Sequence, residues 1–476
     1  MPDSDTGCSI VWTSKAFALW RNLIARGDFS IAEATLAEDT SPAAGEAYDL
    51  LHRLRHEWSI TQKEMWETFW RVIPDVTRAE LEAWTASGAI ESKMIDGERH
   101  YFRREPRNLF LFDTAARNRQ ERAAGKPTTA DRHESTAPIV SHLIDVLRAA
   151  DASPGVRELL PLRTRFSYAL IVKPDRPGAT KGSTLRAWLP FPQHYAQQRD
   201  VKLIDCFPRT HRIAPTSAAH RTIYFEQKVR DPAKPVRFEV SFEYTTSALW
   251  RERLAHDSVI EETRAGRSRH VEQRPPHIVF TDEVRVVVKN LSADSPDKPT
   301  LAKRIWNWVD DEIPWRAEHE YCLIPSIIEQ SLRLRRGDCG VAALTFITLC
   351  RCAGIPARWQ SGWTTDPSTG GNMHDWAEIW LEDFSGWIPV DPSYGKKKTD
   401  DAVMIDRVRD FYFGGLDRYR LIVNTDYGQP LVPAKTSLRS EPLDFQRGEV
   451  ELDGRNLYFD EWDYAFSFEH TPLDSR

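Results

Sequence analysis

Arg-Gly-Asp-Cys-Gly at residues 336–340 and Val-Asp-Pro-Ser-Tyr at residues 390–394 bound the stretch around which the chain is organised. Cys339 falls in the first turn of the apolar helical run that begins there. The unpaired amides and the positive dipole end of a helix start favour a thiolate and can hold an oxyanion, so Cys339 is the candidate nucleophile. Cys350 and Cys352 lie at the far end of the run, where the dipole opposes thiolate formation, and we expect both to be small buried residues.

Two alternating segments supply partners for this thiol. The strand that begins at His374 carries polar and aromatic residues on one face, and the next strand, which ends at Asp391, continues its apolar face. A two-residue connection would place Asp391 opposite His374, and a four-residue connection would make them diagonal neighbours, whereas odd lengths would separate them. Glu378 shares this face but lies roughly 13 Å along the strand. We therefore predict Cys339 as nucleophile, His374 as base and Asp391 as the residue that orients the imidazole.

These segments resemble the core of the transglutaminase-like superfamily. The matching blocks are Gly-Asp-Cys-Gly with its helix, Ala-Gly-Ile-Pro-Ala-Arg at 353–358, His-Asp-Trp-Ala-Glu-Ile-Trp at 374–380 and Gly-Trp-Ile-Pro-Val-Asp-Pro at 386–392. The resemblance implies a papain-like fold with Cys339, His374 and Asp391 in the triad positions. It also implies acyl transfer through a thioester that ends on water or on an amine. Many members have Ala after the histidine; this chain has Asp375, which we expect to point to the opposite face of the strand.

Other candidate site residues rest on weaker patterns. Oxyanion assistance from a residue upstream of the cysteine is common in this superfamily, and Tyr321 or Gln330 could provide it. The chain has seventeen tryptophans, and Trp363 and Trp376 are candidates for lining a substrate cleft. No cysteine or histidine spacing demands a metal, so we expect neither a metal nor a cofactor.

The rest of the 476-residue chain predicts an α+β fold of several domains, because one ordinary core does not reach this length. Ala-Trp-Leu-Pro-Phe-Pro at 187–192 resembles part of the sandwich that often precedes the core in bacterial multidomain members. The expected parts are a mainly helical domain with an Asp-Gly hairpin at 1–114, a linker at 115–137, an antiparallel β-sandwich at 138–275, the transglutaminase-like core at 276–430 and a C-terminal β extension at 431–476.

Composition limits the possible partners. The net charge of −6 gives no general attraction to nucleic acid, and no apolar run approaches the roughly 20 residues that cross a membrane. Six scattered cysteines do not form a disulfide framework. The acidic N-terminus has no signal-peptide pattern, so the default expectation is a cytoplasmic protein unless a signal has been removed. The oligomeric state stays open.

These observations lead to three functional hypotheses. The first is a cysteine hydrolase that cleaves an amide or peptide bond in a peptide, a protein or a cell-wall fragment. The second is a protein-glutamine gamma-glutamyltransferase, which would cross-link or deamidate its substrates. Sequence does not separate these two, because the outcome depends on water exclusion and on access of an amine to the thioester. The third is a catalytically idle binding or scaffold protein.

Overall fold

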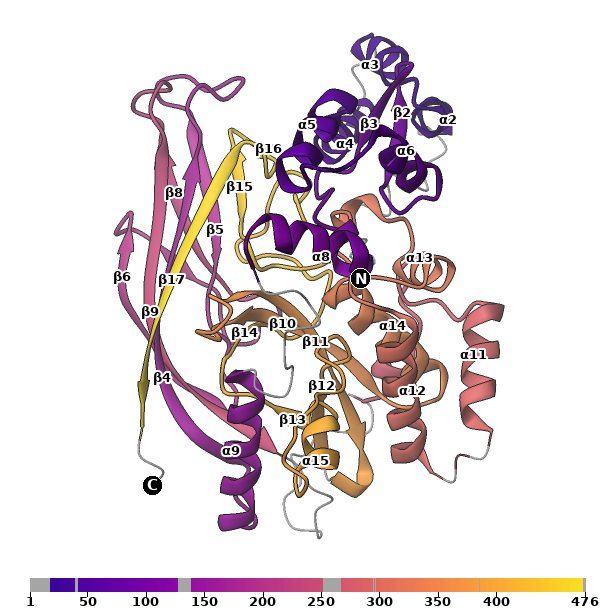
Figure 1. The fold of residues 1–476 in the computed structure, drawn as a ribbon. Coiled ribbons are helices and arrows are strands. Elements are labelled where there is room, and N and C mark those ends of the chain that lie inside the picture. Colours follow the sequence, from indigo (N-terminus) through magenta and orange to yellow (C-terminus); the bar gives the residue numbers. More distant parts are fainter. Residues whose placement is uncertain are drawn as a thin grey trace. The chain divides into compact units, whose positions relative to one another are not determined.

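The structure, a computed structural model, describes residues 18–38, 42–126, 138–250, 267–293, 295, 297–384 and 386–473. Its chain divides into two compact units (Figure 1). Residues Glu134–Pro314 and Ser326–Arg476 make up nearly all of the larger unit, and residues Asp5–His133 and Trp315–Pro325 make up the smaller one. Helices and several antiparallel sheets occur together, so the predicted α+β fold is confirmed.

The smaller unit is mainly helical and contains one small sheet. Its helices are α2 (Ala18–Arg26), α3 (Phe29–Ala37), α4 (Pro42–Glu57), α5 (Gln62–Val72), α6 (Arg78–Ala86), α7 (Leu109–Phe112) and α8 (Thr114–Ala123). The sheet has the order β1 (Ile60–Thr61), β3 (Glu98–Tyr101), β2 (Ser92–Ile95). The expected Asp-Gly hairpin is present, and Asp96 and Gly97 at its turn both have positive φ, as a tight two-residue turn requires.

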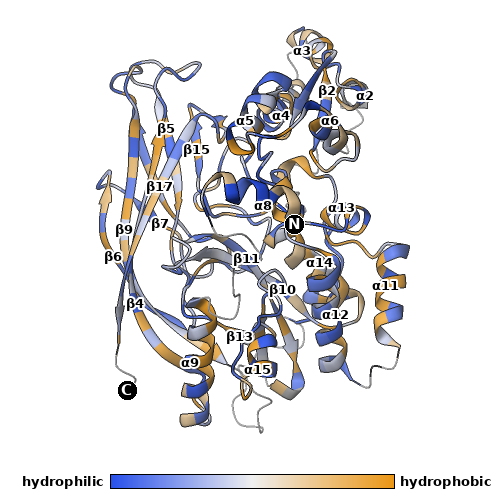
Figure 2. Cartoon of the chain, viewed as in Figure 1, coloured by the Kyte–Doolittle hydropathy of each residue, from blue (hydrophilic) through white to orange (hydrophobic). Residues whose placement is uncertain are grey.

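The predicted linker differs from the structure in its first part. Helix α8 occupies this stretch, and the side chain of Asp113 caps it by accepting from the amide of Ala116. The helix is strongly hydrophilic (Figure 2), so apolar periodicity could not reveal it. Its Ala, Arg, Gln and Glu residues favour helix, and Arg119 holds it by an ion pair with Glu80. Residues 127–137 of the predicted linker lie outside the described residues.

Two five-stranded antiparallel sheets of the larger unit pack face to face as a sandwich (Figure 1). One has the order β13 (Gly415–Leu416), β9 (Val236–Trp250), β4 (Glu158–Val172), β17 (Trp462–Pro472), with β6 (Gln198–Phe207) also on β9. The other has the order β16 (Arg455–Leu457), β15 (Glu449–Leu452), β5 (Thr184–Pro190), β8 (Thr222–Lys228), β7 (Arg212–Ile213). Phe166 and Phe242 of the first sheet and Phe225 of the second share one buried cluster.

The C-terminal strands belong to this sandwich. In Figure 1 the yellow β17 runs along the magenta β4, with which it pairs from Trp462 to Pro472, and β15 pairs with β5. The extension predicted at 431–476 therefore folds as strands, and these strands complete both sheets of the preceding sandwich. Antiparallel strands distant in the sequence can pair in this way because each provides an edge that would otherwise stay open.

The remainder of the larger unit is a four-stranded antiparallel sheet with helices. The sheet has the order β12 (Gly386–Val390), β11 (Asn372–Leu381), β10 (Ala357–Thr364), β14 (Arg420–Asn424). The helices of the larger unit are α9 (Pro138–Ala152), α11 (Asp282–Ser292), α12 (Lys298–Glu312), α13 (Ile327–Leu334), α14 (Cys339–Cys352) and α15 (Ile405–Arg409). Helix α14 packs on β10 and β11, and this packing brings the two halves of the central sequence stretch together.

In the part of the chain that the structure describes, none of the helices combines the length and apolar character needed to span a membrane.

Candidate active site

Cys339 is the first residue of helix α14, as the sequence predicts. Asp338 caps the helix, since its side chain accepts from the amide of Val341 at 3.2 Å. Gly337 precedes the cap where a Cβ atom would come within 2.3 Å of the Val341 side chain, so only glycine fits this approach. At the other end of the helix Cys350 is buried and Cys352 is half-buried.

His374 and Asp391 form a direct pair. Strands β11 and β12 align so that Leu381 lies opposite Gly386, which leaves four residues in the connection. His374 and Asp391 are then diagonal neighbours on one face, one of the two arrangements that the sequence allowed. Nε2 of His374 lies 2.7 Å from Oδ2 of Asp391, and because a carboxylate only accepts, this nitrogen carries the proton.

Asp391 is a fully buried anion with every oxygen engaged. Oδ1 accepts from the amides of Ser393 and Tyr394, and Oδ2 accepts from His374 and from Nη1 of Arg420 at 2.8 Å. Burial alone would raise the pKa of Asp391, but His374, Arg420 and the Tyr394 amide hold that pKa well below its usual range. The carboxylate therefore stays charged and fixes the orientation of the imidazole.

Arg420 is a site residue that sequence reasoning missed. Its guanidinium lies between two carboxylates, with Nη1 on Asp391 and Nε 2.8 Å from Oδ2 of Asp417, and all three side chains are buried. The rings of Tyr394 and Trp376 lie within 4.4 Å and 5.1 Å of the guanidinium carbon. The sequence signal for this site residue was an arginine within a strand, but the sequence does not show that Arg420 pairs with Asp391, 29 residues away.

The second unforeseen contact joins Cys339 to Asp375. Sγ of the cysteine donates to Oδ2 of Asp375 at 3.2 Å, so the aspartate, on the face of β11 opposite His374, points to the thiol. Burial and the negative charges of Asp375 and Asp338 raise the pKa of the Cys339 thiol well above its ordinary value. The prediction of a thiolate favoured by the helix dipole is therefore wrong for this resting structure, because desolvation and two acidic neighbours outweigh the dipole.

Among the hydrogen bonds of the described residues none joins Cys339 to His374, so the thiol and the imidazole are not in direct contact here. Residues 374 and 375 are consecutive, and their Cα atoms lie only ~3.8 Å apart. Burial lowers the pKa of His374, with Arg420 acting in the same direction and Asp391 opposing both. The imidazole is therefore neutral near neutral pH, the form that a general base needs.

The two tryptophans predicted to line a substrate cleft are both fully buried. Trp363 packs in the sandwich cluster and donates to the carbonyl of Gln446, and Trp376 donates to Oε1 of Gln360. Neither ring can contact a substrate in this conformation. The abundance of tryptophan in the core region made both residues candidates for a substrate cleft, but other elements cover both faces of this sheet.

The two oxyanion candidates are not brought to the cysteine by any described contact. Tyr321 lies in a short 3-10 helix (Tyr321–Leu323) that belongs to the smaller unit, whereas Cys339 belongs to the larger one. Gln330 lies in helix α13 and is half-buried, and its amide bonds the carbonyl of Ser326. Their proposed role stays a prediction.

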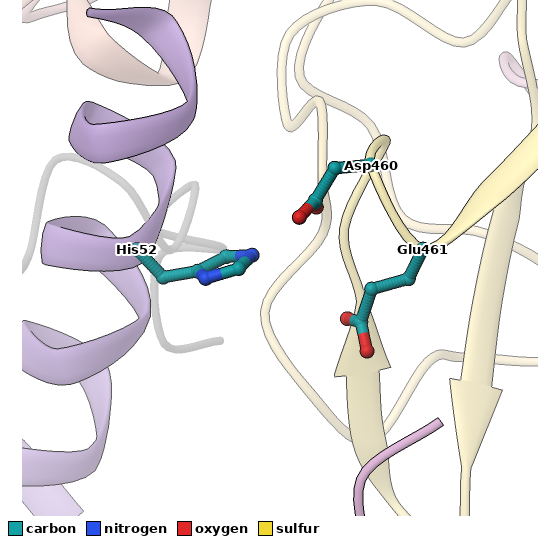
Figure 3. A group of neighbouring side chains, drawn as sticks. All are labelled: His52, Asp460 and Glu461. Atoms are coloured by element: carbon teal, nitrogen blue, oxygen red, sulfur yellow. The ribbon is translucent and has the colours of Figure 1, made fainter. Parts of the chain in front are cut away.

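One group of side chains of metal-ligating type is drawn in Figure 3. His52 comes from helix α4 of the smaller unit, and Asp460 and Glu461 come from the larger unit just before β17. Glu461 already accepts from Arg455 at 2.9 Å and from the amide of Tyr458. Because the histidine and the carboxylates belong to different units, we assign no metal site to them, and the expectation that no metal or cofactor is needed stays a prediction.

A cysteine at a helix start, packed on an antiparallel sheet that carries a His–Asp pair, is the arrangement expected of a transglutaminase-like core. A family model described as the Transglutaminase-like superfamily matches residues 285–392, a range that contains Cys339, His374 and Asp391. This chain therefore contains a transglutaminase-like domain.

Known proteins similar to this chain include a curated relative and several solved structures. The peptide-N(4)-(N-acetyl-beta-glucosaminyl)asparagine amidase of Gallus gallus is 26% identical over 156 residues, which cover 29% of this chain and 23% of the amidase. This chain thus spans about a quarter of that relative's length.

Two solved structures show lower identity. A protein of Cytophaga hutchinsonii, provisionally described as a cysteine protease, has a TM-score of 0.44 at 13% identity and covers 67% of this chain and 93% of its own. The periplasmic domain of TgpA from Pseudomonas aeruginosa has a TM-score of 0.26 at 16% identity and covers 58% of this chain and 96% of its own.

Proposed function

We propose that this protein is a cysteine-dependent hydrolase that cleaves an amide or peptide bond through a thioester on Cys339. The observation that carries the proposal is the pair of consecutive residues on β11: His374 is bound to Asp391, and Asp375 touches Sγ of Cys339. Sγ of Cys339 therefore contacts the residue next to the oriented base, one position along β11. Catalytic hydrogen bonds are often absent without substrate and form in the substrate complex, so the missing thiol–imidazole contact is compatible with this role.

The chemistry assigned to each group follows from its position. Nδ1 of His374 has no hydrogen-bond partner among the described residues, so it can accept the proton of the Cys339 thiol while Asp391 holds Nε2–H. The thiolate then attacks the carbonyl carbon, and free amides at the start of α14 stabilise the resulting oxyanion.

The second half of the reaction reverses these proton movements. His374 gives its proton to the departing amine, which leaves the acyl group on Sγ of Cys339 as a thioester. Water attacks the thioester as His374 takes a proton from it, and the acid product leaves with the thiol restored. Asp391 and Arg420 keep one orientation of the imidazole through both halves.

We propose water rather than an amine as the acceptor. The name of the Gallus gallus relative denotes an amidase, a hydrolytic activity on an amide, and this likeness supports hydrolysis. Protein-glutamine gamma-glutamyl transfer would use the same thioester and differ only in the acceptor. As substrate we propose an amide in a peptide, a protein or a cell-wall fragment, and no nucleic acid.

The experiment combines an activity screen with an acceptor test. Peptides and cell-wall fragments are incubated with the protein and a labelled amine, and release of acid is compared with incorporation of label. We expect the wild type to hydrolyse a substrate and Cys339→Ala to lose this activity. Cys352→Ala, a change at the other end of the same helix, should keep it. Incorporation of the amine without hydrolysis would replace the hydrolase by a transferase.

A catalytically idle scaffold makes a different prediction. Cys339 would then stay unmodified by iodoacetamide under every condition that preserves the fold, and both cysteine variants would behave like the wild type in the substrate screen. Mass mapping of the alkylated peptide distinguishes Cys339 from the other cysteines.

A further inference from the structure

Asp375 is held in place on both of its carboxylate oxygens. Oδ2 accepts from the thiol of Cys339 at 3.2 Å, and Oδ1 accepts from Nε2 of Gln446 at 2.7 Å. The same amide nitrogen donates to the carbonyl of His374 at 2.9 Å, so Gln446 ties the aspartate to its own strand. With a side chain only 2% exposed, Asp375 has no water to compete for these contacts.

A second buried carboxyl, Asp444, lies behind the first. Burial, together with the neighbouring charges of Asp444 and Asp338, raises the pKa of the Asp375 carboxyl well above its ordinary value. Asp444 is held by the Ser361 hydroxyl at 2.7 Å and by Nδ2 of Asn424 at 3.0 Å. The thiol, Asp375 and Asp444 therefore form a continuous chain of three acidic groups inside the protein.

The surroundings of this chain determine where its charge can lie. Asp338, the cap of α14, adds another negative charge on the thiol side. Burial raises the pKa of Asp444 to about 6, although hydrogen bonds from Ser361 and the Phe445 amide and the charges of Arg439 and Arg447 lower it. The positive charges of Arg439 and Arg447 thus favour the ionised form of Asp444. The Cys339 thiol, by contrast, has acidic neighbours.

We propose that Asp375, supported by Asp444, is a positioning residue that keeps the sulfur of Cys339 protonated in the resting protein. Oδ2 of Asp375 accepts the proton of the thiol in a hydrogen bond, which stabilises the protonated sulfur, and a thiolate would add negative charge to a buried site that already holds several acidic groups. The thiol therefore keeps its proton until the contact with Asp375 is broken. This inference rests on the proposed function, because it matters only if Cys339 is the nucleophile.

The test measures alkylation of Cys339 by iodoacetamide as a function of pH, with the modified peptide quantified by mass spectrometry. This readout needs no substrate and no turnover. Wild type is compared with Asp375→Asn and Asp444→Asn. Glu378→Gln is the matched control, because it neutralises another buried acid of the same strand that pairs with Arg358 instead of the thiol. Circular dichroism establishes that each variant is folded.

We expect Asp375→Asn to move the midpoint of the alkylation profile to lower pH by about one unit, which is ~10-fold faster alkylation at pH 7. Asp444→Asn leaves Asp375 as the remaining acid beside the thiol and removes the charge that opposes its ionisation, so the midpoint should not fall below that of wild type, and Glu378→Gln should leave the midpoint in place. A folded Asp375→Asn variant with an unchanged or higher midpoint would overturn the inference, because the carboxyl would then be neutral toward the thiol or would activate it.

The two proposals fail separately. An unchanged midpoint together with amide hydrolysis that depends on Cys339 removes the role of Asp375 and leaves the hydrolase. A lowered midpoint without turnover on any amide keeps the role of Asp375 as a controller of thiol ionisation and removes the hydrolase. If Cys339 is not alkylated in any folded variant up to pH 9, both proposals are overturned.

Discussion

Nε2 of His374 lies 2.7 Å from Oδ2 of Asp391 across a diagonal of strands β11 and β12, and Arg420 shares that oxygen. This contact joins residues 17 positions apart with both side chains inside the protein. A hydrogen bond to a buried carboxylate fixes both the tautomer and the orientation of an imidazole. The proposed chemistry depends on this pair, and several consequences can be measured.

Removing the charge of Asp391 should reduce the turnover rate more than it reduces the stability of the fold. In Asp391→Asn the amide can present either an acceptor or a donor to Nε2, so the imidazole loses its fixed tautomer, and we expect kcat to fall roughly 10³-fold with a small change in KM. Steady-state hydrolysis of the best amide substrate measures this effect. Asp463→Asn, a change at an exposed aspartate, is the control and should keep wild-type turnover. Equal activity of Asp391→Asn and wild type would exclude the assigned role.

Replacing Arg420 should destabilise the larger unit strongly. Arg420→Met leaves the buried carboxylates of Asp391 and Asp417 without their cation, and uncompensated buried charge costs ~3–5 kcal/mol of unfolding free energy. Urea unfolding at pH 7 measures the loss. Arg237→Met removes an exposed ion pair with Glu239 and should cost at most ~1 kcal/mol. Similar losses for both variants would contradict the importance of burial.

Acid should destabilise the larger unit through buried neutral histidines. Burial lowers the pKa of His142 and of His277 to about 4, below the value of 6.5 that an exposed histidine has. Between pH 6.5 and 4 these histidines bind protons in the unfolded chain but not in the folded chain, so stability falls as pH falls. Each site contributes a slope of up to ~1.4 kcal/mol per pH unit. Urea unfolding at several pH values should give a shallower slope for His277→Gln, and an unchanged slope would show that the site does not titrate.

The smaller unit should respond to pH in the opposite direction through His319. Burial disfavours its charged form, but the carboxylates of Glu57 and Glu91, at 3.2 and 2.9 Å, raise the pKa of His319 from 6.5 to about 10. A raised folded-state pKa stabilises fully below pH 6.5, and the contribution is lost as pH rises toward 10. The Trp58 ring lies 5.0 Å from the imidazole, so tryptophan fluorescence can follow unfolding here. His319→Gln should lose less stability than wild type between pH 7 and 10; an equal loss would place the titration elsewhere.

Local sequence patterns predicted the secondary structure that carries Cys339, His374 and Asp391. The strand expected to begin at His374 and the strand expected to end at Asp391 correspond to β11 and β12, because alternating side chains are typical of strands. The start of α14 at Cys339 followed from the apolar run that begins there, and the Asp96-Gly97 hairpin followed from its dipeptide, since helix starts and tight turns are short-range structures. Helix α8 was missed because a polar surface helix lacks the apolar period.

Contacts between distant segments could not be predicted in the same way. Nothing in the sequence places the guanidinium of Arg420 on Asp391, or Asp375 on both Cys339 and Asp444. Trp363 and Trp376 were predicted as candidates for a substrate cleft, but other elements pack over them and bury both side chains. The ionisation state of a side chain depends on such packing, because burial and neighbouring charges shift a pKa more than the local sequence does.

The amino-acid sequence by itself determined the helix that begins at Cys339, the two strands that carry His374 and Asp391, and the allowed registers between them, because hydrogen bonding and side-chain alternation act over a few residues. Only the tertiary structure decided that Asp375 bonds the thiol, that Arg420 shares the triad carboxylate, and that burial and acidic neighbours raise the pKa of the thiol. These contacts and the pKa shift depend on which charged groups are buried next to each other, and only the folded chain brings these groups together.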